Sequence, residues 1–259
     1  MNHLIFDIET IPDVEYGRRL LGLHGLPDAA VAAAMFAQRQ QKAGTDFLPL
    51  PQHRVVAIAC ALRRGDTLRV WSLGDAHGGE RELLERFFEG IERFTPDLVS
   101  WNGGGFDLPV MHYRCMLHGV RAARYWEHGE EDSTFRYNNY LSRFHWRHLD
   151  LMDVLSGFQV RGRASLADVA ALLGLPGKMG FSGAEVWSAW QAGNLAGIRR
   201  YCETDVLNTY LVFLSFERMR GHLDTTEWEA ECGRVRELLR SSGEAHHQEF
   251  LEQWAGLAQ

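Results

Sequence analysis

Two carboxylates stand one residue apart near the start of the chain, inside the otherwise apolar run LIFDIET. If this run is a strand, Asp7 and Glu9 project from the same face, because side chains two residues apart in a strand point the same way. Two like charges so close repel each other, and each raises the other's affinity for a proton. A divalent cation removes the conflict, since Mg²⁺ and Mn²⁺ prefer carboxylate oxygens. The alternative is an edge strand whose acids face water.

A second acid follows a glycine run in the middle of the chain. In the stretch WNGGGFDLPV, Asp107 comes after an expected short strand and near the start of an expected helix over 106–119. The glycines at 103–105 allow close approach of a ligand, and Asn102 adds an uncharged donor and acceptor. The same pattern fits an aspartate that only caps the helix. A dinucleotide-binding motif fits poorly, because GGG is not G-x-G-x-x-G.

A third acid lies late in the chain, in RRYCETDVLNTY. Tyr201 and Asp205 are four residues apart, so on a helix they lie side by side on one face. Asp205 stands close to the apolar stripe of that helix, where a lone carboxylate is unfavourable unless it is paired or bound to a metal. The alternative is an acid at the margin of the stripe that reaches solvent.

The elements expected to position these acids mix strands and helices. Strands are predicted at LIFDI, VVAIACAL, LRVWSLG and DLVSWN, the second and third joined as a hairpin across RRGD. Helices are predicted over 20–42, over ERELLERFFEGIERF, over 106–119, from Asn194 to Gly221 and as a pair within 224–259, with capping-box starts at Ser165 and Ser182. This mixture predicts an α/β fold with a mixed sheet between layers of helices.

Length, charge and cysteine content exclude several classes of protein. The 259 residues allow one elaborated domain. A net charge of -7 argues against a protein that coats nucleic acid by bulk charge, but not against an enzyme that holds metal ions at a cluster of acids. The four cysteines form no CxxC pair, which predicts reduced thiols rather than a zinc ribbon. No apolar run is long enough to span a bilayer, and the early acids do not fit a signal peptide, so we expect a soluble cytoplasmic protein.

The three acidic motifs appear in an order that resembles one enzyme superfamily, the DEDD 3′→5′ exonucleases, in the branch with a tyrosine in its last motif. The motifs are Asp7-x-Glu9, Asn102 through Phe106-Asp107, and Tyr201-x-x-x-Asp205. The chain looks similar to the exonuclease domain of family B DNA polymerases, here without a polymerase. FLPLPQHRVVAIA, WNGGGFDLPV, HLDLMDVL and KMGFSGAEVW also look like a stand-alone bacterial group of predicted exonucleases. The resemblance covers roughly residues 1–220, which leaves 221–259 as a helical C-terminal extension packed on the same domain.

The resemblance implies a ribonuclease H-like fold and hydrolysis of a phosphodiester with two divalent ions, Mg²⁺ or Mn²⁺, about 4 Å apart. Its metal ligands would be Asp7, Glu9, Asp107 and Asp205. Tyr201 would orient the attacking water, since a phenol is a poor general base at neutral pH. Thr10, Asn102 and Phe106 would line the pocket for the terminal nucleotide.

The expected activity is therefore removal of nucleoside 5′-monophosphates from the 3′ end of single-stranded DNA. Trimming of RNA 3′ ends is one alternative, and a non-catalytic module that binds nucleic acid is another, although the intact acids and Tyr201 count against it. The stretch RYNNYLSRFHWRH, residues 136–148, interleaves arginines with aromatic residues that either stack on bases or pack onto the core. Asp150 and Asp153 are not expected to bind metal: one is expected to end a strand, and the other to begin the following helix or to lie on its surface.

Overall fold

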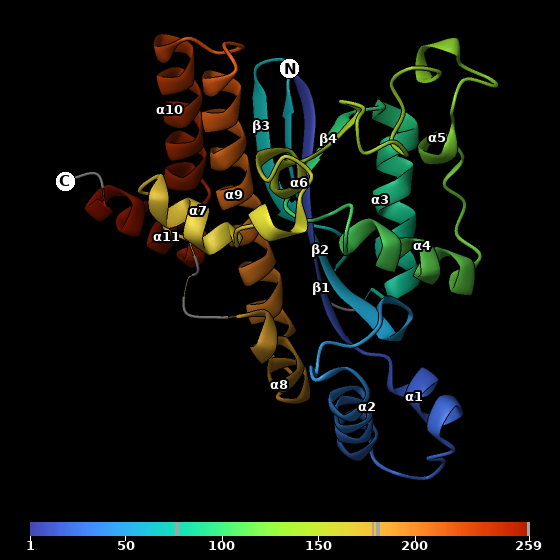
Figure 1. The fold of residues 1–259 in the computed structure, drawn as a ribbon. Coiled ribbons are helices and arrows are strands. Elements are labelled where there is room, and N and C mark those ends of the chain that lie inside the picture. Colours follow the sequence, from blue (N-terminus) through green and yellow to red (C-terminus); the bar gives the residue numbers. More distant parts are fainter. Residues whose placement is uncertain (76–77, 178, 180–181, 258–259) are drawn as a thin grey trace.

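The structure is a computed structural model that describes residues 1–75, 78–177, 179 and 182–257. A five-stranded sheet lies at its centre, with the strand order β3-β2-β1-β4-β5 (Figure 1). The strands are β1 (Asn2–Pro12), β2 (His53–Arg64), β3 (Thr67–Ser72), β4 (Asp97–Ser100) and β5 (His148–Asp150). Strands β1, β2 and β3 pair antiparallel, whereas β4 pairs parallel with both β1 and β5. The mixed sheet and the β2–β3 hairpin confirm the expectation from the sequence.

Helices cover both faces of this sheet. The long ones are α2 (Asp28–Ala43), α3 (Glu80–Phe94), α4 (Asp107–His118), α9 (Leu195–Met219), α10 (Thr225–Ser241) and α11 (Ala245–Leu257). The short ones are α1 (Val14–Leu21), α5 (Ala123–Trp126), α6 (Leu151–Leu155), α7 (Leu166–Leu172) and α8 (Val186–Gln191). Single 3-10 turns lie at Leu50–Gln52, Ser133–Phe135, Val160–Gly162 and Gly183–Glu185. Figure 1 shows α3 and α4 on one side of the sheet and α9 on the other, with α10 and α11 beside α9.

The central strand β1 contributes one face to each of two cores. Leu4, Phe6 and Ile8 belong to the core shared with α3 and α4. Ile5 belongs to the core shared with α9. The two-residue period of a strand continues from Ile5 to residues 7 and 9, so the two acids of β1 project from one face, as the sequence predicts, and this face is the one toward α9.

The C-terminal helices share a core with α9, because Val235 of α10 and Phe250 of α11 are completely buried there. A buried ion pair also joins α10 to the sheet: Arg63 of β2 donates to both carboxylate oxygens of Glu231, at 2.7 and 2.6 Å. The pair of helices expected in the tail is therefore present. No described helix has the length and apolar character needed to cross a membrane. All four cysteines are buried and free of disulfides.

Two local predictions are wrong. The helix expected over 20–42 is two helices, because Gly22 takes the left-handed conformation (φ 67°) that ends α1, and α2 begins only after Pro27. Ser182 starts a 3-10 turn and donates from its hydroxyl to Glu185 at 2.8 Å, without accepting a backbone N–H. Ser165, by contrast, caps α7 as expected.

Candidate active site

The fold brings four acids together from three elements that are far apart in the sequence. Asp7 and Glu9 come from β1, Asp107 is the first residue of α4, and Asp205 lies in the middle of α9. Burial raises the pKa of Asp7 well above its ordinary value, and Asp107, Glu9 and Asp205 raise it further. Burial, Asp205 and Asp107 do the same to the pKa of Glu9. The predicted acids therefore form one electrostatic cluster.

Asp107 reaches β1 because β4 ends before its neighbour does. The pairing of β1 with β4 stops at Ile5 and Val99, while β1 continues to Pro12. The backbone N–H of Ile8 then has no partner on β4, and the Oδ1 of Asp107 accepts it at 3.1 Å. This contact replaces a bond of the sheet and places the Asp107 carboxylate beside the acids of β1.

The glycine turn before Asp107 is held by its own backbone and by β5. Asn102 has a left-handed φ of 64°, and its carbonyl accepts the N–H groups of Gly105 and Phe106 at 3.0 and 2.9 Å. Asp150, the last residue of β5, accepts the N–H groups of Asn102 and Gly104, both at 2.9 Å. Asp150 thus ends its strand as expected and supports the turn that carries Asp107.

Gly103 is required in this turn by space. A Cβ at this position would lie 2.3 Å from the Ser100 hydroxyl oxygen and 3.3 Å from the Phe6 ring. Only the absence of a side chain lets the turn pack this closely on β4 and β1.

On α9, the tyrosine and aspartate of the last motif are neighbours as predicted. The Tyr201 hydroxyl is hydrogen-bonded to Asp205, and burial together with the charges of Asp205 and Glu9 raises the pKa of this phenol. The thiol of Cys202 donates to the backbone oxygen and the Oδ2 of Asp7, at 3.3 and 3.4 Å. Nothing in the sequence pattern indicated this contact, which joins α9 directly to β1.

Cys202 is not a thiolate nucleophile. Burial, followed by the charges of Asp7 and Glu9, raises the pKa of its thiol well above the ordinary value. A protonated thiol is a weak nucleophile and a hydrogen-bond donor. Its role beside the acids is therefore to donate to Asp7.

The chemistry of the cluster fits a divalent metal. Burial is the main cause that raises the pKa of Asp107 to about 7. Among the described residues, no arginine, lysine or histidine forms a salt bridge with Asp7, Glu9 or Asp107. Crowded, buried carboxylates without a cationic side chain bind hard divalent cations through their oxygens.

A second group of side chains adjoins the acids. The ring of Phe106 lies 5.1 Å from His53 and 5.5 Å from Phe47, which is 54% exposed. The Nε2 of His53 lies 3.1 Å from the Leu48 carbonyl and must donate to it, so its Nδ1 accepts the Thr10 hydroxyl at 2.8 Å. The structure thus places Thr10 and Phe106 in contact with the same residue, His53, beside the acids. Phe47 and His53 were not among the predicted site residues. Their sequence signal was the stretch FLPLPQHRVVAIA, which contains both residues and leads into the second strand. We call the four side chains of Thr10, Phe47, His53 and Phe106 the wall beside the acids.

In the arginine- and aromatic-rich stretch 136–148, one aromatic residue packs onto the core and others stay exposed. Tyr140 is buried, and its hydroxyl donates to the Pro96 carbonyl at 2.6 Å. Tyr137 and Phe144 are mostly exposed. Arg143 donates to Asp153 of α6 at 2.8 Å, and Arg163 donates to it at 2.7 Å, so the Asp153 carboxylate is occupied by ion pairs with two arginines.

Comparison with known proteins agrees with this architecture. A family model described as "Predicted 3'-5' exonuclease related to the exonuclease domain of PolB" matches residues 45–254. The matched range contains Asp107, Tyr201 and Asp205 and extends into α11, whereas β1 lies before it. No curated protein matches the chain.

Among solved structures, the chain resembles the family B DNA polymerase from the hyperthermophilic archaeon Pyrobaculum calidifontis, with a TM-score of 0.51 and 19% identity. The match covers 85% of this chain and 24% of the polymerase, so the chain spans about a quarter of that protein. At this identity the likeness concerns the fold, and it confirms the expected α/β, ribonuclease H-like class. Because the family model covers most of its length, this chain belongs to the family of predicted 3′-5′ exonucleases related to the exonuclease domain of PolB.

Proposed function

We propose that this chain shortens single-stranded DNA from its 3′ end by metal-dependent hydrolysis, releasing nucleoside 5′-monophosphates. The observation that carries the proposal is the cluster of four buried or half-buried acids contributed by β1, α4 and α9. Membership of a family of predicted 3′-5′ exonucleases supports the reaction class and a nucleic acid substrate. The choice of DNA, of a single-stranded end and of two metal ions is ours.

Four carboxylates would hold the metal: Asp7, Glu9, Asp107 and Asp205. Their oxygens suit two Mg²⁺ or Mn²⁺ ions, which when bound supply positive charge to the phosphodiester and lower the pKa of a bound water. The protein's own contribution is to keep the carboxylates oriented. The Ile8 N–H fixes Asp107, and the Cys202 thiol fixes Asp7.

Tyr201 is suited to positioning rather than to proton abstraction. Its raised pKa keeps the phenol protonated near neutral pH. A protonated hydroxyl beside Asp205 can donate to the phosphate or hold the attacking water in line, and it is a poor general base.

The wall beside the acids suits the terminal nucleotide. Phe106 and Phe47 offer aromatic faces for base stacking, which tolerates any sequence. Thr10 and Asn102 would line the same pocket, with the Thr10 hydroxyl held by neutral His53. An unpaired end presents its base to such rings, which favours a single strand over a duplex.

The test is a cleavage assay on 5′-labelled oligonucleotides of one sequence, prepared as single-stranded DNA, duplex DNA and RNA, with Mg²⁺ or Mn²⁺. We expect a ladder shortened one nucleotide at a time from the 3′ end, fastest on single-stranded DNA. Faster digestion of RNA would overturn the choice of DNA. Binding of the oligonucleotides without cleavage would show a binding module instead of an enzyme.

Replacing Tyr201 with phenylalanine should slow hydrolysis by about 10- to 100-fold, because only the positioning hydroxyl is lost. Mn²⁺ affinity, measured by isothermal titration calorimetry, should stay within a factor of about two, since the four carboxylates remain. Tyr113→Phe on α4 is the matched control, because Tyr113 is exposed on the surface. A large loss of metal affinity in Tyr201→Phe would mean that the tyrosine holds the metal site together.

The stabilisation of the chain by Mn²⁺ should grow as pH rises from 5 to 8. The folded-state pKa of Asp107 is about 7, and those of Asp7 and Glu9 are also raised, whereas unfolded carboxyls titrate near ~4. Between these values the folded chain holds protons that the unfolded chain has lost, so without metal the free energy of unfolding falls as pH rises. Mn²⁺ must displace those protons, and therefore binds more weakly at pH 5.

Thermal melts with Mn²⁺ and with EDTA at pH 5, 6, 7 and 8 measure this effect. In the wild type, the Tm with Mn²⁺ minus the Tm with EDTA should increase with pH. In Asp7→Asn this difference should be smaller than in the wild type at each pH. The same difference at every pH would contradict the raised carboxyl pKa values.

A further inference from the structure

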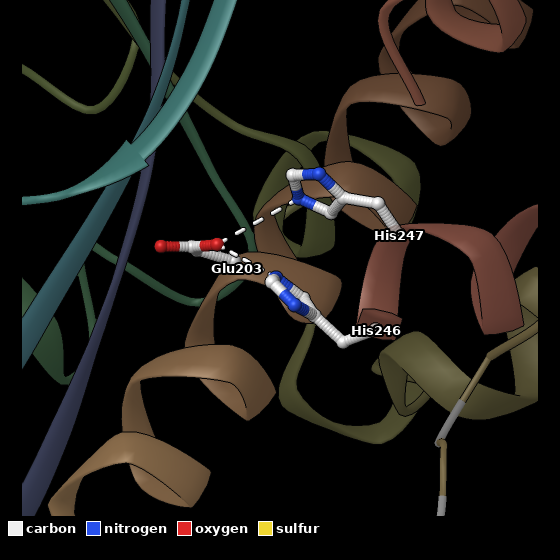
Figure 2. A group of neighbouring side chains, drawn as sticks. All are labelled: Glu203, His246 and His247. Atoms are coloured by element: carbon white, nitrogen blue, oxygen red, sulfur yellow. Dashed lines mark hydrogen bonds and ion pairs between the residues drawn. The ribbon is translucent and has the colours of Figure 1, made fainter. Parts of the chain in front are cut away.

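A second group of possible ligands lies where the first turn of α11 meets α9. Glu203 projects from α9, and His246 and His247 approach it from the N-terminal end of α11 (Figure 2). Glu203 lies between Tyr201 and Asp205 in the sequence, so the group is attached to the same helix as the last acidic motif. None of its three members has a part in the proposed hydrolysis.

Both imidazoles converge on a single carboxylate oxygen. The Oε2 of Glu203 lies 2.8 Å from the Nε2 of His246 and 3.6 Å from the Nε2 of His247. One donor atom from each of the three residues lies within 4.8 Å of the other two. In a tetrahedral zinc site with bonds of about 2.0–2.1 Å, neighbouring ligand atoms are about 3.3 Å apart. The two observed distances lie on either side of that value.

His247 is buried, and its imidazole ring lacks hydrogen-bond partners in the part of the chain that the structure describes. The residue is 3% exposed, and neither nitrogen of its ring has a hydrogen-bond partner among the described residues; the Nε2 is the one that faces Glu203. Buried polar atoms without a partner are rare and costly in proteins. A metal ion bound by this nitrogen would satisfy it.

The other carboxylate oxygen is already held in place. The Ser72 hydroxyl, at the end of β3, donates to the Oε1 of Glu203 at 2.6 Å. This bond turns Oε2 toward the two histidines. Metal ligands are commonly oriented by hydrogen bonds of this kind from surrounding residues.

The donor set differs from that of the acid cluster. Two imidazole nitrogens and one carboxylate oxygen are typical of Zn²⁺, whereas an all-carboxylate site favours Mg²⁺ or Mn²⁺. The two donor sets therefore favour different metals within one chain. A water molecule would complete four-fold coordination of the zinc.

We propose that Glu203, His246 and His247 bind one Zn²⁺ ion that fastens α11 to α9. Such an ion would tie the C-terminal extension to the helix that carries Tyr201 and Asp205. The proposal stands on this side-chain geometry and does not depend on the nuclease reaction.

Metal analysis of the purified full-length chain tests the proposal. Each protein is loaded with Zn²⁺, dialysed against zinc-free buffer and analysed by inductively coupled plasma mass spectrometry. We expect about one zinc per chain in the wild type and less than about a tenth of that in Glu203→Gln and His247→Ala. His128→Ala is the matched control, because His128 is an exposed histidine outside the group. Asp7→Asn, which weakens the acid cluster, should keep its zinc.

Two results would overturn the proposal. One is a wild type that retains no more zinc than Glu203→Gln. The other is zinc that is lost in Asp7→Asn but kept in Glu203→Gln and His247→Ala, which would place the ion at the acids. Cobalt substitution tests the site without a variant. Wild-type protein loaded with Co²⁺ should show the strong visible absorption of a tetrahedral ion with nitrogen ligands. Absence of this absorption would count against the zinc site. The cleavage assay is independent of all these measurements.

Discussion

Replacing Asp7 with alanine should reduce nuclease turnover by at least about 10³-fold while the chain stays folded. Asp7 lies at the centre of the acid cluster, where Asp107, Glu9 and Asp205 all act on it. Its loss removes a ligand that the proposed reaction requires. The fold does not depend on this charge, because removing one of several crowded carboxylates relieves repulsion. Asp205→Ala should have the same effect, although Asp205 lies on a different element, α9.

The measurement is single-turnover cleavage of the preferred oligonucleotide, together with a thermal melt in EDTA. Asp66→Ala is the matched control, since Asp66 is an exposed aspartate in the turn between β2 and β3. We expect full activity in the control and a Tm equal to or above that of the wild type in Asp7→Ala. If either cluster variant keeps wild-type turnover, the acids are not the metal ligands of this reaction.

The grouping of the acids was predictable wherever one element alone sets the spacing. Asp7 and Glu9 share a face because a strand repeats every two residues. Tyr201 and Asp205 are neighbours because a helix brings residues four apart together. Those periods also explain why the α/β class and most elements could be predicted from the sequence.

Contacts that depend on where one element ends relative to another could not be predicted. Asp107 binds the Ile8 N–H only because β4 stops several residues before β1. Local sequence does not encode that difference in length. The contact of Cys202 with Asp7 likewise depends on how α9 packs across β1. The prediction of one helix over 20–42 was wrong for a local reason, because Gly22 ends α1.

A buried network around Glu80 was equally hidden in the sequence, where this residue looked like one more charge at a helix start. Its carboxylate accepts from Arg114 of α4 at 2.7 and 2.6 Å, and from His118 at 2.8 Å. It also accepts the backbone N–H of Val55 at 2.6 Å. Val55 pairs with Thr10 beside the irregularity in the β1–β2 register that follows Glu9. The network therefore holds α3, α4 and β2 together next to the acids.

Replacing Glu80 with alanine should lower the free energy of unfolding by about 3–5 kcal/mol, because it leaves the buried Arg114 guanidinium and the Val55 N–H without their main acceptor. For a chain of this size that corresponds to a fall in Tm of roughly 6–20 °C. Glu82→Ala is a matched control on the same first turn of α3: its partner Arg86 is four residues away and about half exposed. Such a surface pair contributes only about 0.3–0.5 kcal/mol. Urea unfolding of the two variants and the wild type decides the comparison, and equal losses of stability in both would show that Glu80 does not anchor the network.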